Sequence, residues 1–273
     1  MHPPKLEGKT AVVTGAGSGI GRATAQAFAA AGARVALCDI DEARVQAVAA
    51  DLGDRALLAQ RVDVSDRAQM RAFADAVHAL VPGVDVVVNN AGVAVGGTFL
   101  DTTLDDRDWL LGVNLRGVVH GCHFFLPKMV ERGLGGQVIN LSSILGIFPA
   151  PGVSAYVASK FAVLGMSQTL RAELAPHRIG VTAICPGLIA TQIVADGRMQ
   201  GGVGSRKTSV VDVFAKRGLS PTKVADAILD SVRTNPAIRT VGYDGWALAA
   251  AHRIAPELTQ RIAASVSRRM GMD

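Results

Sequence analysis

Tyr156 and Lys160 are two side chains whose types and spacing could support proton transfer. They lie four residues apart in a stretch that favours a helix, so both side chains face the same way. A phenol has a pKa near 10, so removing its proton at pH 7 costs about 4 kcal/mol. A lysine ammonium a few ångströms away favours the phenolate and lowers that cost. The spacing therefore predicts a tyrosine that acts as general acid or base on a carbonyl or an alcohol.

Two hydroxyl groups precede this pair. Ser142 and Ser143 end a predicted strand, where a hydroxyl could hold the oxygen atom of a substrate. A pair spaced like Tyr156 and Lys160 is also common on the exposed faces of helices, so the spacing alone leaves a structural role open. The chain has only two tyrosines, and the position of this one after a serine-rich strand end favours the catalytic interpretation.

A glycine-rich run, TGAGSGIG from Thr14 to Gly21, follows one predicted strand and opens a predicted helix. The N-terminus of a helix has unpaired N–H groups and a partial positive charge, which suit a phosphate group. Glycine lets the backbone approach the phosphate because no side chain intervenes. The spacing departs from the strict G-x-G-x-x-G pattern, so the run by itself fits a tight turn equally well.

Asp39 makes nucleotide binding the better interpretation of that run. It ends the next predicted strand, where a carboxylate can accept hydrogen bonds from ribose hydroxyls. The same charge would repel a 2′-phosphate, so we expect NAD rather than NADP. Asp41 is better placed to cap the following helix, which leaves Asp39 for the ribose. Asp63, beside Val64, could accept from an adenine amino group, although strand-ending aspartates are also common in turns.

The elements that position these residues alternate regularly along the chain. The pattern predicts strands over residues 10–14, 34–39, 55–64, 84–90, 136–143, 179–185 and 237–242. It predicts helices over 19–31, from 41 onward, over 66–80 with Ser65 as N-cap, over 104–131 and over 155–175. This alternation is typical of an α/β fold with a doubly wound parallel sheet of about seven strands, flanked by helices. We expect one domain over residues 1–273, with a mobile loop in the glycine-rich segment 188–217.

The composition of the chain narrows the class of protein and the kinds of partner that we expect. Hydrophobic residues make up 49% and charged residues 19% of the chain, which indicates a folded globule. The net charge of +5 is mild, and without a basic arm interleaved with aromatic residues we expect no nucleic-acid partner. The first residues lack the apolar segment of a secretory signal, and no long apolar run predicts a membrane span. We therefore expect a cytoplasmic protein.

Metal and disulfide sites are not expected. Cys38, Cys122 and Cys185 are far apart in the sequence, so we interpret them as core thiols in a reducing compartment. His120 and His123 share a helix face but lack further ligands, so we expect surface or interface histidines and no metal.

Together the motifs resemble those of the short-chain dehydrogenase/reductase family, and among its members the NAD-preferring ones. The resemblance covers residues 10 to about 191, with each motif in the family's order: Thr14-Gly15-x-x-x-Gly19-Ile20-Gly21, Asp39, Asp63-Val64, Asn89-Asn90-Ala91-Gly92, Asn114, Ser143, Tyr156-x-x-x-Lys160, and Pro186-Gly187 followed by Thr191. It implies a Rossmann-like fold and a homo-oligomer, commonly a tetramer built through the long helices near 104–132 and 155–176.

The resemblance also implies roles for individual residues. Ser143 would orient the substrate oxygen, Tyr156 would be the acid or base, and Lys160 would bind the nicotinamide ribose and tune Tyr156. Asn114 would kink the long helix and hold a water molecule in a proton relay. The implied cofactor-binding residues are Gly15, Ser18, Gly19, Ile20, Asp39, Asp63, Val64, Asn90, Ala91, Gly92, Tyr156, Lys160, Pro186, Gly187, Ile189 and Thr191.

The C-terminal third departs from the shared pattern, and we expect it to shape the substrate pocket. Residues of about 188–217 would form a substrate lid. Its apolar side chains favour an apolar substrate, with packing against the body of the protein as the alternative: Ile189, Ile193, Val194, Met199, Val210, Val211 and Phe214. Residues 246–273 predict a helical extension in which Pro256 starts or kinks a second helix. Its apolar stripe favours docking on a neighbouring subunit or over the pocket, with a membrane surface as the alternative. The stripe consists of Leu248, Ile254, Leu258, Ile262 and Val266.

The sequence thus predicts an NAD-dependent oxidoreductase that interconverts a secondary alcohol and a ketone. A cyclic alcohol, a steroid-like ring or a long-chain alcohol fits the apolar lid. Two alternatives remain at this stage. One is an NADPH-dependent ketoreductase, for instance of a 3-oxoacyl thioester, and the other is a protein that senses the NAD redox state without turnover.

Overall fold

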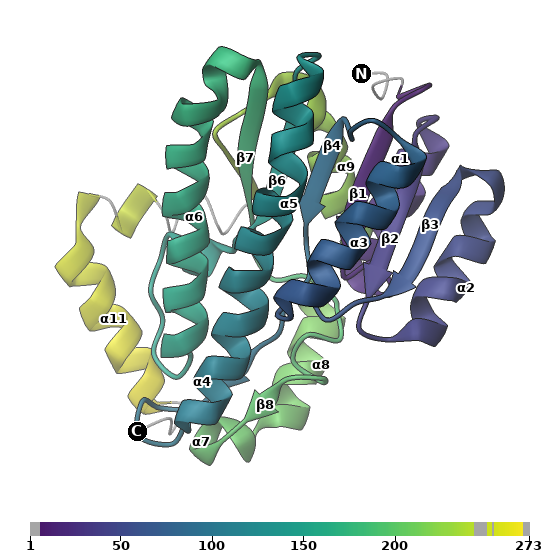
Figure 1. Ribbon diagram of the computed structural model, residues 1–273. Coiled ribbons are helices and arrows are strands. Elements are labelled where there is room, and N and C mark those ends of the chain that lie inside the picture. The colour runs from purple at the N-terminus through teal and green to yellow at the C-terminus, as the bar shows by residue number, and fades with distance from the viewer. Residues whose placement is uncertain (1–5, 243–249, 253, 270–273) are drawn as a thin grey trace.

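The central feature of the computed structural model, which describes residues 6–242, 250–252 and 254–269, is one parallel β-sheet (Figure 1). Its seven strands lie in the order β3-β2-β1-β4-β6-β7-β9, and every neighbouring pair is parallel. The strands are β1 (Thr10–Thr14), β2 (Arg34–Asp39), β3 (Ala56–Arg61), β4 (Val86–Asn89), β6 (Gly136–Leu141), β7 (Ile179–Pro186) and β9 (Ile238–Val241). The predicted α/β sheet of about seven strands is confirmed, with β9 at one edge.

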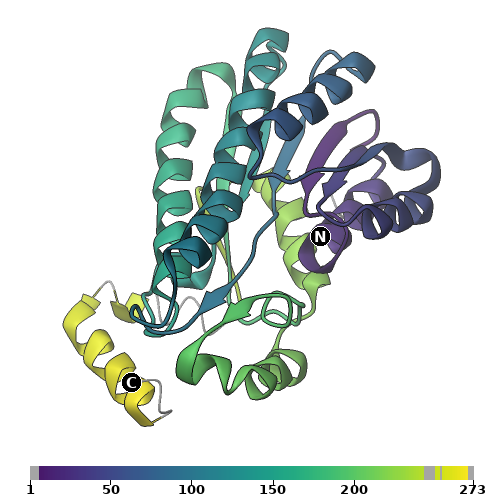
Figure 2. The same cartoon turned by 60° about the horizontal axis from the view of Figure 1, so that its bottom comes forward.

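Helices cover both faces of the sheet (Figures 1 and 2). One layer contains α1 (Gly19–Ala30), α2 (Glu42–Leu52) and α9 (Pro221–Thr234), and the other contains α3 (Arg67–Leu80), α5 (Gly117–Arg132) and α6 (Ser154–Leu174). Short 3-10 turns lie between these elements, over Gly53–Arg55, Ile144–Gly146 and Ala175–His177.

Each inner strand supplies apolar side chains to both layers. In β1, Ala11 and Val13 belong to the core on the α1 side, while Val12 belongs to the core on the α5 side. In β4, Val88 and Val87 divide in the same way. Successive side chains of a strand point to opposite faces, so a strand buried on both faces needs a continuous apolar run. This explains why the runs TAVVT and VVVN fold into central strands.

The sheet order places a topological switch between β1 and β4. The chain moves outward from β1 to β2 and β3, and then returns to pair β4 with the free side of β1. In open parallel sheets, ligands bind beyond the carboxyl ends of the strands at such a switch. The loops that follow these two strands contain Gly15 and Asn90.

The helix predicted over residues 104–131 is not continuous. α4 (Leu104–Leu111) runs into a π-helical segment over Gly112–Arg116, and α5 follows. Asn114 lies in the π-helical segment, where a wider turn inserts one extra residue and shifts the helix face. The N-cap of α3 is Asp66 and not Ser65, because the Asp66 carboxylate accepts from the N–H groups of the first turn.

The segment 188–217, predicted as a mobile loop, contains regular structure (Figure 2). It holds a short strand β8 (Arg198–Met199) and two helices, α7 (Gly201–Gly204) and α8 (Lys207–Arg217). β8 pairs with β5 (Val95–Gly96) in a separate two-stranded sheet. Residues 188–217 are therefore attached to the body of the molecule by backbone hydrogen bonds.

The C-terminal extension ends in α11 (Pro256–Arg269), which starts at Pro256 as predicted. Leu248 of the predicted apolar stripe lies outside the described residues. Ile254, Leu258 and Ile262 of that stripe are exposed. Across the described ranges, no helix combines the length and the apolar character needed to cross a membrane.

The cysteines and histidines follow the expectations in part. Cys38, Cys122 and Cys185 are all buried and unpaired, which confirms core thiols. His120 is buried rather than at the surface, and its Nδ1 lies 2.9 Å from the Val64 carbonyl. In the part of the chain that the structure describes, no cluster of metal-binding side chains occurs.

Candidate active site

The glycine-rich loop after β1 is tied to the loop after β4. The Asn90 amide donates to the carbonyls of Thr14 (2.8 Å) and Gly15 (3.1 Å). In return, the Thr14 hydroxyl accepts from the N–H groups of Asn90 (3.0 Å) and Ala91 (3.1 Å). Gly15 has φ of +64°, and an added Cβ would lie 2.8 Å from the Ala91 Cα. The loop geometry therefore requires glycine at this position.

The N-terminus of α1 fits the phosphate groups of a dinucleotide. Ser18 is the N-cap, yet its side chain makes no capping hydrogen bond, and the first turn contains no acidic residue. Gly19 has φ of +51°, and an added Cβ would lie 3.2 Å from Thr191 Cγ2. The first N–H groups of the helix thus lack a side-chain acceptor, in a loop kept open by glycine.

Asp39 lies directly beside this loop. Its carboxylate accepts from the N–H groups of Gly17 (2.8 Å) and Asp41 (3.0 Å). A carboxylate has about four acceptor sites, so two hydrogen bonds leave capacity for ribose hydroxyls. Asp41 caps α2 by accepting from the Arg44 N–H at 3.0 Å, as predicted. The residues that would hold the adenosine ribose therefore fit the group.

Asp63 and Val64 follow β3, which ends at Arg61, so the strand predicted over residues 55–64 is shorter than expected. Asp63 Oδ1 accepts from both the N–H (2.9 Å) and the hydroxyl (2.7 Å) of Ser65. Val64 is buried, and an added Cβ at Gly117 would lie 2.7 Å from its Cγ2. The tight contact with Gly117 fixes the loop after β3 against the start of α5.

Tyr156 and Lys160 lie on one face of α6, as their spacing predicts. Lys160 is only 4% exposed, and its Nζ donates to the Leu141 carbonyl at 2.9 Å. The same Nζ lies 5.5 Å from the centre of the Tyr156 ring. The Ser143 hydroxyl accepts from the Leu145 N–H at 3.1 Å, and it lies close enough to Tyr156 to lower the pKa of the phenol. The structure therefore brings the three side chains together at the end of β6.

Ser142 differs from its neighbour in what it contacts. Its hydroxyl donates to the backbone carbonyl of Lys160 at 2.8 Å and is buried. Ser142 thus fastens β6 to α6, while Ser143 faces Tyr156.

Burial changes the acidity of both catalytic candidates. It raises the pKa of Tyr156 to about 12, and the hydrogen bond with Ser143 acts in the opposite direction. It lowers the pKa of Lys160 to about 8. The sequence predicts that Lys160 lowers the pKa of Tyr156, but in the chain alone desolvation raises that pKa and Ser143 supplies the opposing effect. Tyr156 is consequently a neutral phenol at pH 7.

Asn114 holds the segment after β4 in place. Its amide donates to the Val93 carbonyl (3.0 Å) and accepts from the Val93 N–H (2.8 Å), and it also contacts the Ser159 hydroxyl at 3.3 Å. An added Cβ at Gly92 would lie 3.4 Å from Asn114 Oδ1 and 3.6 Å from Lys160 Nζ. Gly92 thus leaves room between the π-helical segment and Lys160.

The loop after β7 completes the edge of the site. Pro186 ends the strand, and the Gly187 N–H donates to the Val241 carbonyl at 2.9 Å. Ile189 is buried, and its carbonyl accepts from the Thr191 N–H at 2.9 Å. Ile20, in the first turn of α1, packs against the core on the α1 side of the sheet.

Two groups that help to build the candidate site were not among the site residues predicted from the sequence. The Thr14 hydroxyl joins the two loops, and its place at the head of the glycine motif could have revealed it. The Leu141 carbonyl orients Lys160, and a backbone acceptor leaves no signal in the residue types.

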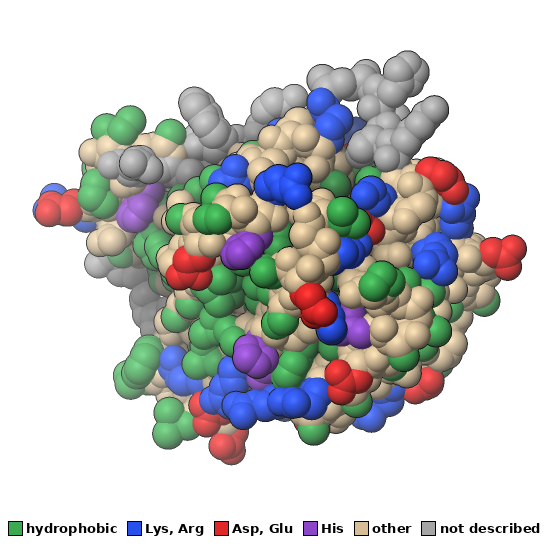
Figure 3. All heavy atoms as spheres, turned by 45° about the horizontal axis from the view of Figure 1, so that its top comes forward, with side chains coloured by type: hydrophobic (Ala, Val, Ile, Leu, Met, Phe, Trp, Pro, Cys, Tyr) green, Lys and Arg blue, Asp and Glu red, His purple; other side chains and the backbone are tan. Residues whose placement is uncertain are grey.

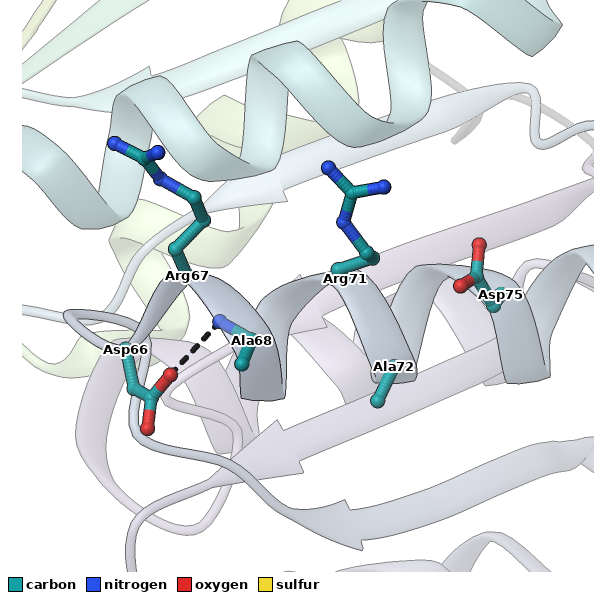
Figure 4. Close-up of a pocket in the computed structure, with 6 residues that line it drawn as sticks. All are labelled: Asp66, Arg67, Ala68, Arg71, Ala72 and Asp75. Atoms are coloured by element: carbon teal, nitrogen blue, oxygen red, sulfur yellow. Dashed lines mark hydrogen bonds between the residues drawn. The ribbon is translucent and has the colours of Figure 1, made fainter.

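A hollow on the exposed side of α3 contains none of the candidate residues (Figure 4). Arg67 and Arg71 project from the same side of the helix, while an Asp66 oxygen accepts from the Ala68 N–H at 2.8 Å. The Arg71 guanidinium lies over the Phe124 ring at 5.3 Å. This hollow is a surface feature of α3 and is separate from the strand ends that carry the candidate site.

Comparison with known proteins agrees with the geometry at the strand ends. A family model described as short chain dehydrogenase matches residues 9–200. The chain belongs to the short chain dehydrogenase family.

Relatives of this short chain dehydrogenase are oxidoreductases by name. One, named "Probable oxidoreductase EphD", from Mycobacterium tuberculosis, is 44% identical over 253 residues, which cover 90% of the chain and 43% of the relative. The chain thus spans less than half of that relative's length. Another, 3beta-hydroxysteroid dehydrogenase 2 from Eggerthella lenta, is 35% identical over 231 residues, covering 83% of the chain and 88% of the relative.

Solved structures of the family share the fold of this dehydrogenase. A short chain dehydrogenase/reductase from Burkholderia phymatum in complex with NAD has a TM-score of 0.87 and 29% identity, covering 93% of this chain and 96% of that one. A 3-ketoacyl-(acyl-carrier-protein) reductase from Brucella melitensis, complexed with NADH, has a TM-score of 0.76 and 30% identity, covering 86% and 97%.

Proposed function

We propose that this short chain dehydrogenase uses NAD to interconvert an apolar secondary alcohol and the corresponding ketone. The observation that carries the proposal is the convergence of Ser143, Tyr156 and buried Lys160 at the end of β6. The glycine-rich loop at the start of α1, which would hold the phosphate groups, lies at the same edge of the sheet.

Each residue has a distinct task in the proposed reaction. NAD, when bound, supplies the hydride acceptor, and its reduced form the donor. Ser143 holds the substrate oxygen, and Tyr156 donates its proton to that oxygen in ketone reduction or takes one in alcohol oxidation. Lys160 supplies a positive charge beside the phenol and a donor for a ribose hydroxyl. Because burial raises the pKa of Tyr156 to about 12, alcohol oxidation depends on positive charge near the phenol.

Asp39 supports NAD as the cofactor. Its carboxylate lies against Gly17 at the edge of the phosphate cradle, where it would accept from ribose hydroxyls and repel a 2′-phosphate. The Burkholderia relative with NAD and the Brucella relative with NADH are consistent with this preference.

Two observations support an apolar, ring-shaped substrate. A relative with 35% identity is named as a 3beta-hydroxysteroid dehydrogenase. Tyr156 also belongs to a small apolar cluster with Val93, Val95 and Trp109, so the surroundings of the phenol favour hydrocarbon over charged groups.

The homo-oligomer expected from the sequence remains part of the proposal. Val119 on α5 and Phe161 on α6 are 41% and 39% exposed. Figure 3 shows apolar side chains gathered on the face that carries these helices. A second copy of the chain could cover them, and sedimentation velocity would report the assembly.

A screen of secondary alcohols tests the proposed activity. Cyclohexanol, a long-chain secondary alcohol and a 3β-hydroxysteroid are each incubated with NAD and with NADP, and the absorbance of the reduced nicotinamide is followed. We expect NAD-dependent turnover, fastest with the steroid. A greater rate with NADP, or NADPH-dependent reduction of a 3-oxoacyl thioester alone, would favour the ketoreductase alternative. NADH binding without turnover of any alcohol or ketone would favour a redox sensor.

A further inference from the structure

The lid is bonded to a segment that also contacts the start of the catalytic helix. The N–H groups of Arg198 and Gln200 donate to the carbonyls of Ala94 (3.0 Å) and Gly96 (2.8 Å). On its other side, the Gly97 N–H donates to the Gly152 carbonyl at 2.8 Å, shortly before α6 begins. The lid strand β8, the strand β5 and the N-terminus of α6 therefore lie side by side.

Side chains reinforce this backbone pairing. The Asp106 carboxylate on α4 accepts from the Arg198 guanidinium (3.1 Å) and from the Gln200 amide (3.2 Å). The Asp106 side chain is 8% exposed and that of Arg198 is 45% exposed. Burial raises the pKa of the Asp106 carboxyl, but hydrogen bonds from Arg198 and two neighbours outweigh burial and leave the pKa below its usual value. The carboxylate thus stays charged at neutral pH.

The same guanidinium makes a second contact. The Arg198 Cζ lies 4.0 Å from the centre of the Trp109 ring. Trp109 packs with Leu110, Ala155 and Tyr156 in one apolar cluster. Arg198 therefore links a buried carboxylate to the aromatic surroundings of the proposed catalytic phenol.

An ordinary exposed ion pair contributes little to stability, but this pair differs because one partner is buried. Removing Arg198 would leave the Asp106 carboxylate without its cation in a site shielded from water, which is strongly unfavourable. The lid strand would relieve that state by separating from β5 and admitting water. The geometry thus makes the attachment of the lid depend on one side chain.

We propose that Arg198 is a positioning residue, which clasps the lid to α4 through Asp106 and Trp109 and thereby sets the surroundings of Tyr156. The positioning role at Tyr156 rests on the proposed function, whereas the clasp itself is a property of the fold. Weakening the clasp frees β8 from β5 without altering the seven-stranded sheet.

Hydrogen–deuterium exchange on the full chain tests the clasp without requiring activity. In the wild-type chain we expect the N–H groups of Arg198 and Gln200 to be protected, because both donate to β5. In Arg198→Met we expect residues 198–200 to exchange at least tenfold faster, while the sheet residues Val87 and Ile139 keep their protection. Arg239→Met is the matched control, because Arg239 also pairs with an aspartate and is 43% exposed.

A spectroscopic measurement separates the clasp from general loosening. In a Trp246→Phe background Trp109 is the only tryptophan, and its emission should change in Arg198→Met but not in Arg239→Met. Arg198→Lys keeps the charge but loses the planar stack, so we expect intermediate exchange with changed emission. Unchanged exchange and emission in Arg198→Met would overturn the clasp, even if the chain oxidises alcohols. Loss of protection at Val87 would mean that Arg198 supports the whole fold, which also contradicts it.

Discussion

Lys160 lies one helical turn beyond Tyr156, with its Nζ 5.5 Å from the centre of the Tyr156 ring and 2.9 Å from the Leu141 carbonyl. The ammonium is therefore held by the end of β6 and not by the phenol. This arrangement keeps a positive charge near Tyr156 while the phenol itself stays protonated, with a pKa raised by burial to about 12. In the chain alone, Tyr156 can therefore donate its proton. Removal of that proton to form the phenolate requires further positive charge near the ring.

Tyr156→Phe should abolish most turnover while leaving cofactor binding intact. The ring and its packing remain, but the hydroxyl that contacts Ser143 is gone. Because general acid–base catalysis contributes roughly 10²- to 10⁴-fold, we expect a loss of that size in kcat. Steady-state kinetics and NADH titration measure the two effects. Tyr243→Phe, which changes the other tyrosine, is the control, and equal losses in both variants would argue against a catalytic phenol.

Asp39→Asn should relax the preference for NAD. The amide oxygen can still accept from the Gly17 N–H, but the charge that repels a 2′-phosphate is removed. Unit charges about 4 Å apart interact by roughly 1 kcal/mol even in bulk water, so we expect the NAD-to-NADP affinity ratio to fall by roughly tenfold. Asp41→Asn removes a nearby charge from the cap of α2 and should leave the ratio unchanged. If the NAD-to-NADP affinity ratio fell equally in both variants, the preference would come from the overall negative charge of this region and not from Asp39.

Lys160→Met should change the pH dependence of stability. Burial lowers the pKa of Lys160 to about 8 from 10.5, so between these values the unfolded chain binds more protons than the folded chain. The free energy of unfolding of the wild type therefore increases, through this group, as pH rises from 8 to 10.5. We expect the free energy of unfolding of the variant, relative to that of the wild type, to be highest at pH 7. This advantage of the variant should shrink towards pH 10, by roughly 3 kcal/mol at most.

Urea unfolding of both proteins at pH 7 and pH 10 measures that difference. Burial raises the pKa of all three thiols, so they titrate near this range only in the unfolded chain. Cys38 and Cys122 contribute equally in both proteins, whereas Cys185 interacts with Lys160, so both proteins carry Cys185→Ala. A difference that stays constant or widens with pH would show that Lys160 is not desolvated in the folded chain.

Asn114→Ala should destabilise the fold and loosen the loop after β4. Both hydrogen bonds to the Val93 backbone are lost, and the buried polar groups are left without partners. Because an unsatisfied buried group costs about 1–3 kcal/mol, we expect a decrease of that order in the free energy of unfolding. Faster exchange of the Val93 N–H should accompany it. Thr169→Ala, which removes an exposed helix hydroxyl, should show neither effect.

Local sequence patterns predicted most of the sheet and much of the site. The apolar runs around Val12 and Val87 specify strands buried on both faces, and Asp41 caps its helix where expected. Tyr156 and Lys160 face the same way because helix geometry alone determines it. These features depend on residues close together in the chain.

Features that depend on distant contacts left no local signal, although the family resemblance implied a kink in the long helix at Asn114. Residues 104–131 have one apolar pattern, and the π-helical segment within it depends on Asn114 bonding to Val93, which lies 21 positions away. The strand β8 (Arg198–Met199) is only two residues long, and its partner is Val95–Gly96. Such short strands have no periodicity of their own, so nothing local separates them from a loop.

The three buried thiols give the molecule an internal reporter of its own opening. Cys38 lies in β2, Cys122 in α5 and Cys185 in β7, and burial raises the pKa of all three. An alkylating dye requires an accessible thiolate, so it can label each position only when the surrounding layer separates. Peptide mapping after brief labelling would therefore distinguish which half of the sheet comes apart first, without any engineered probe.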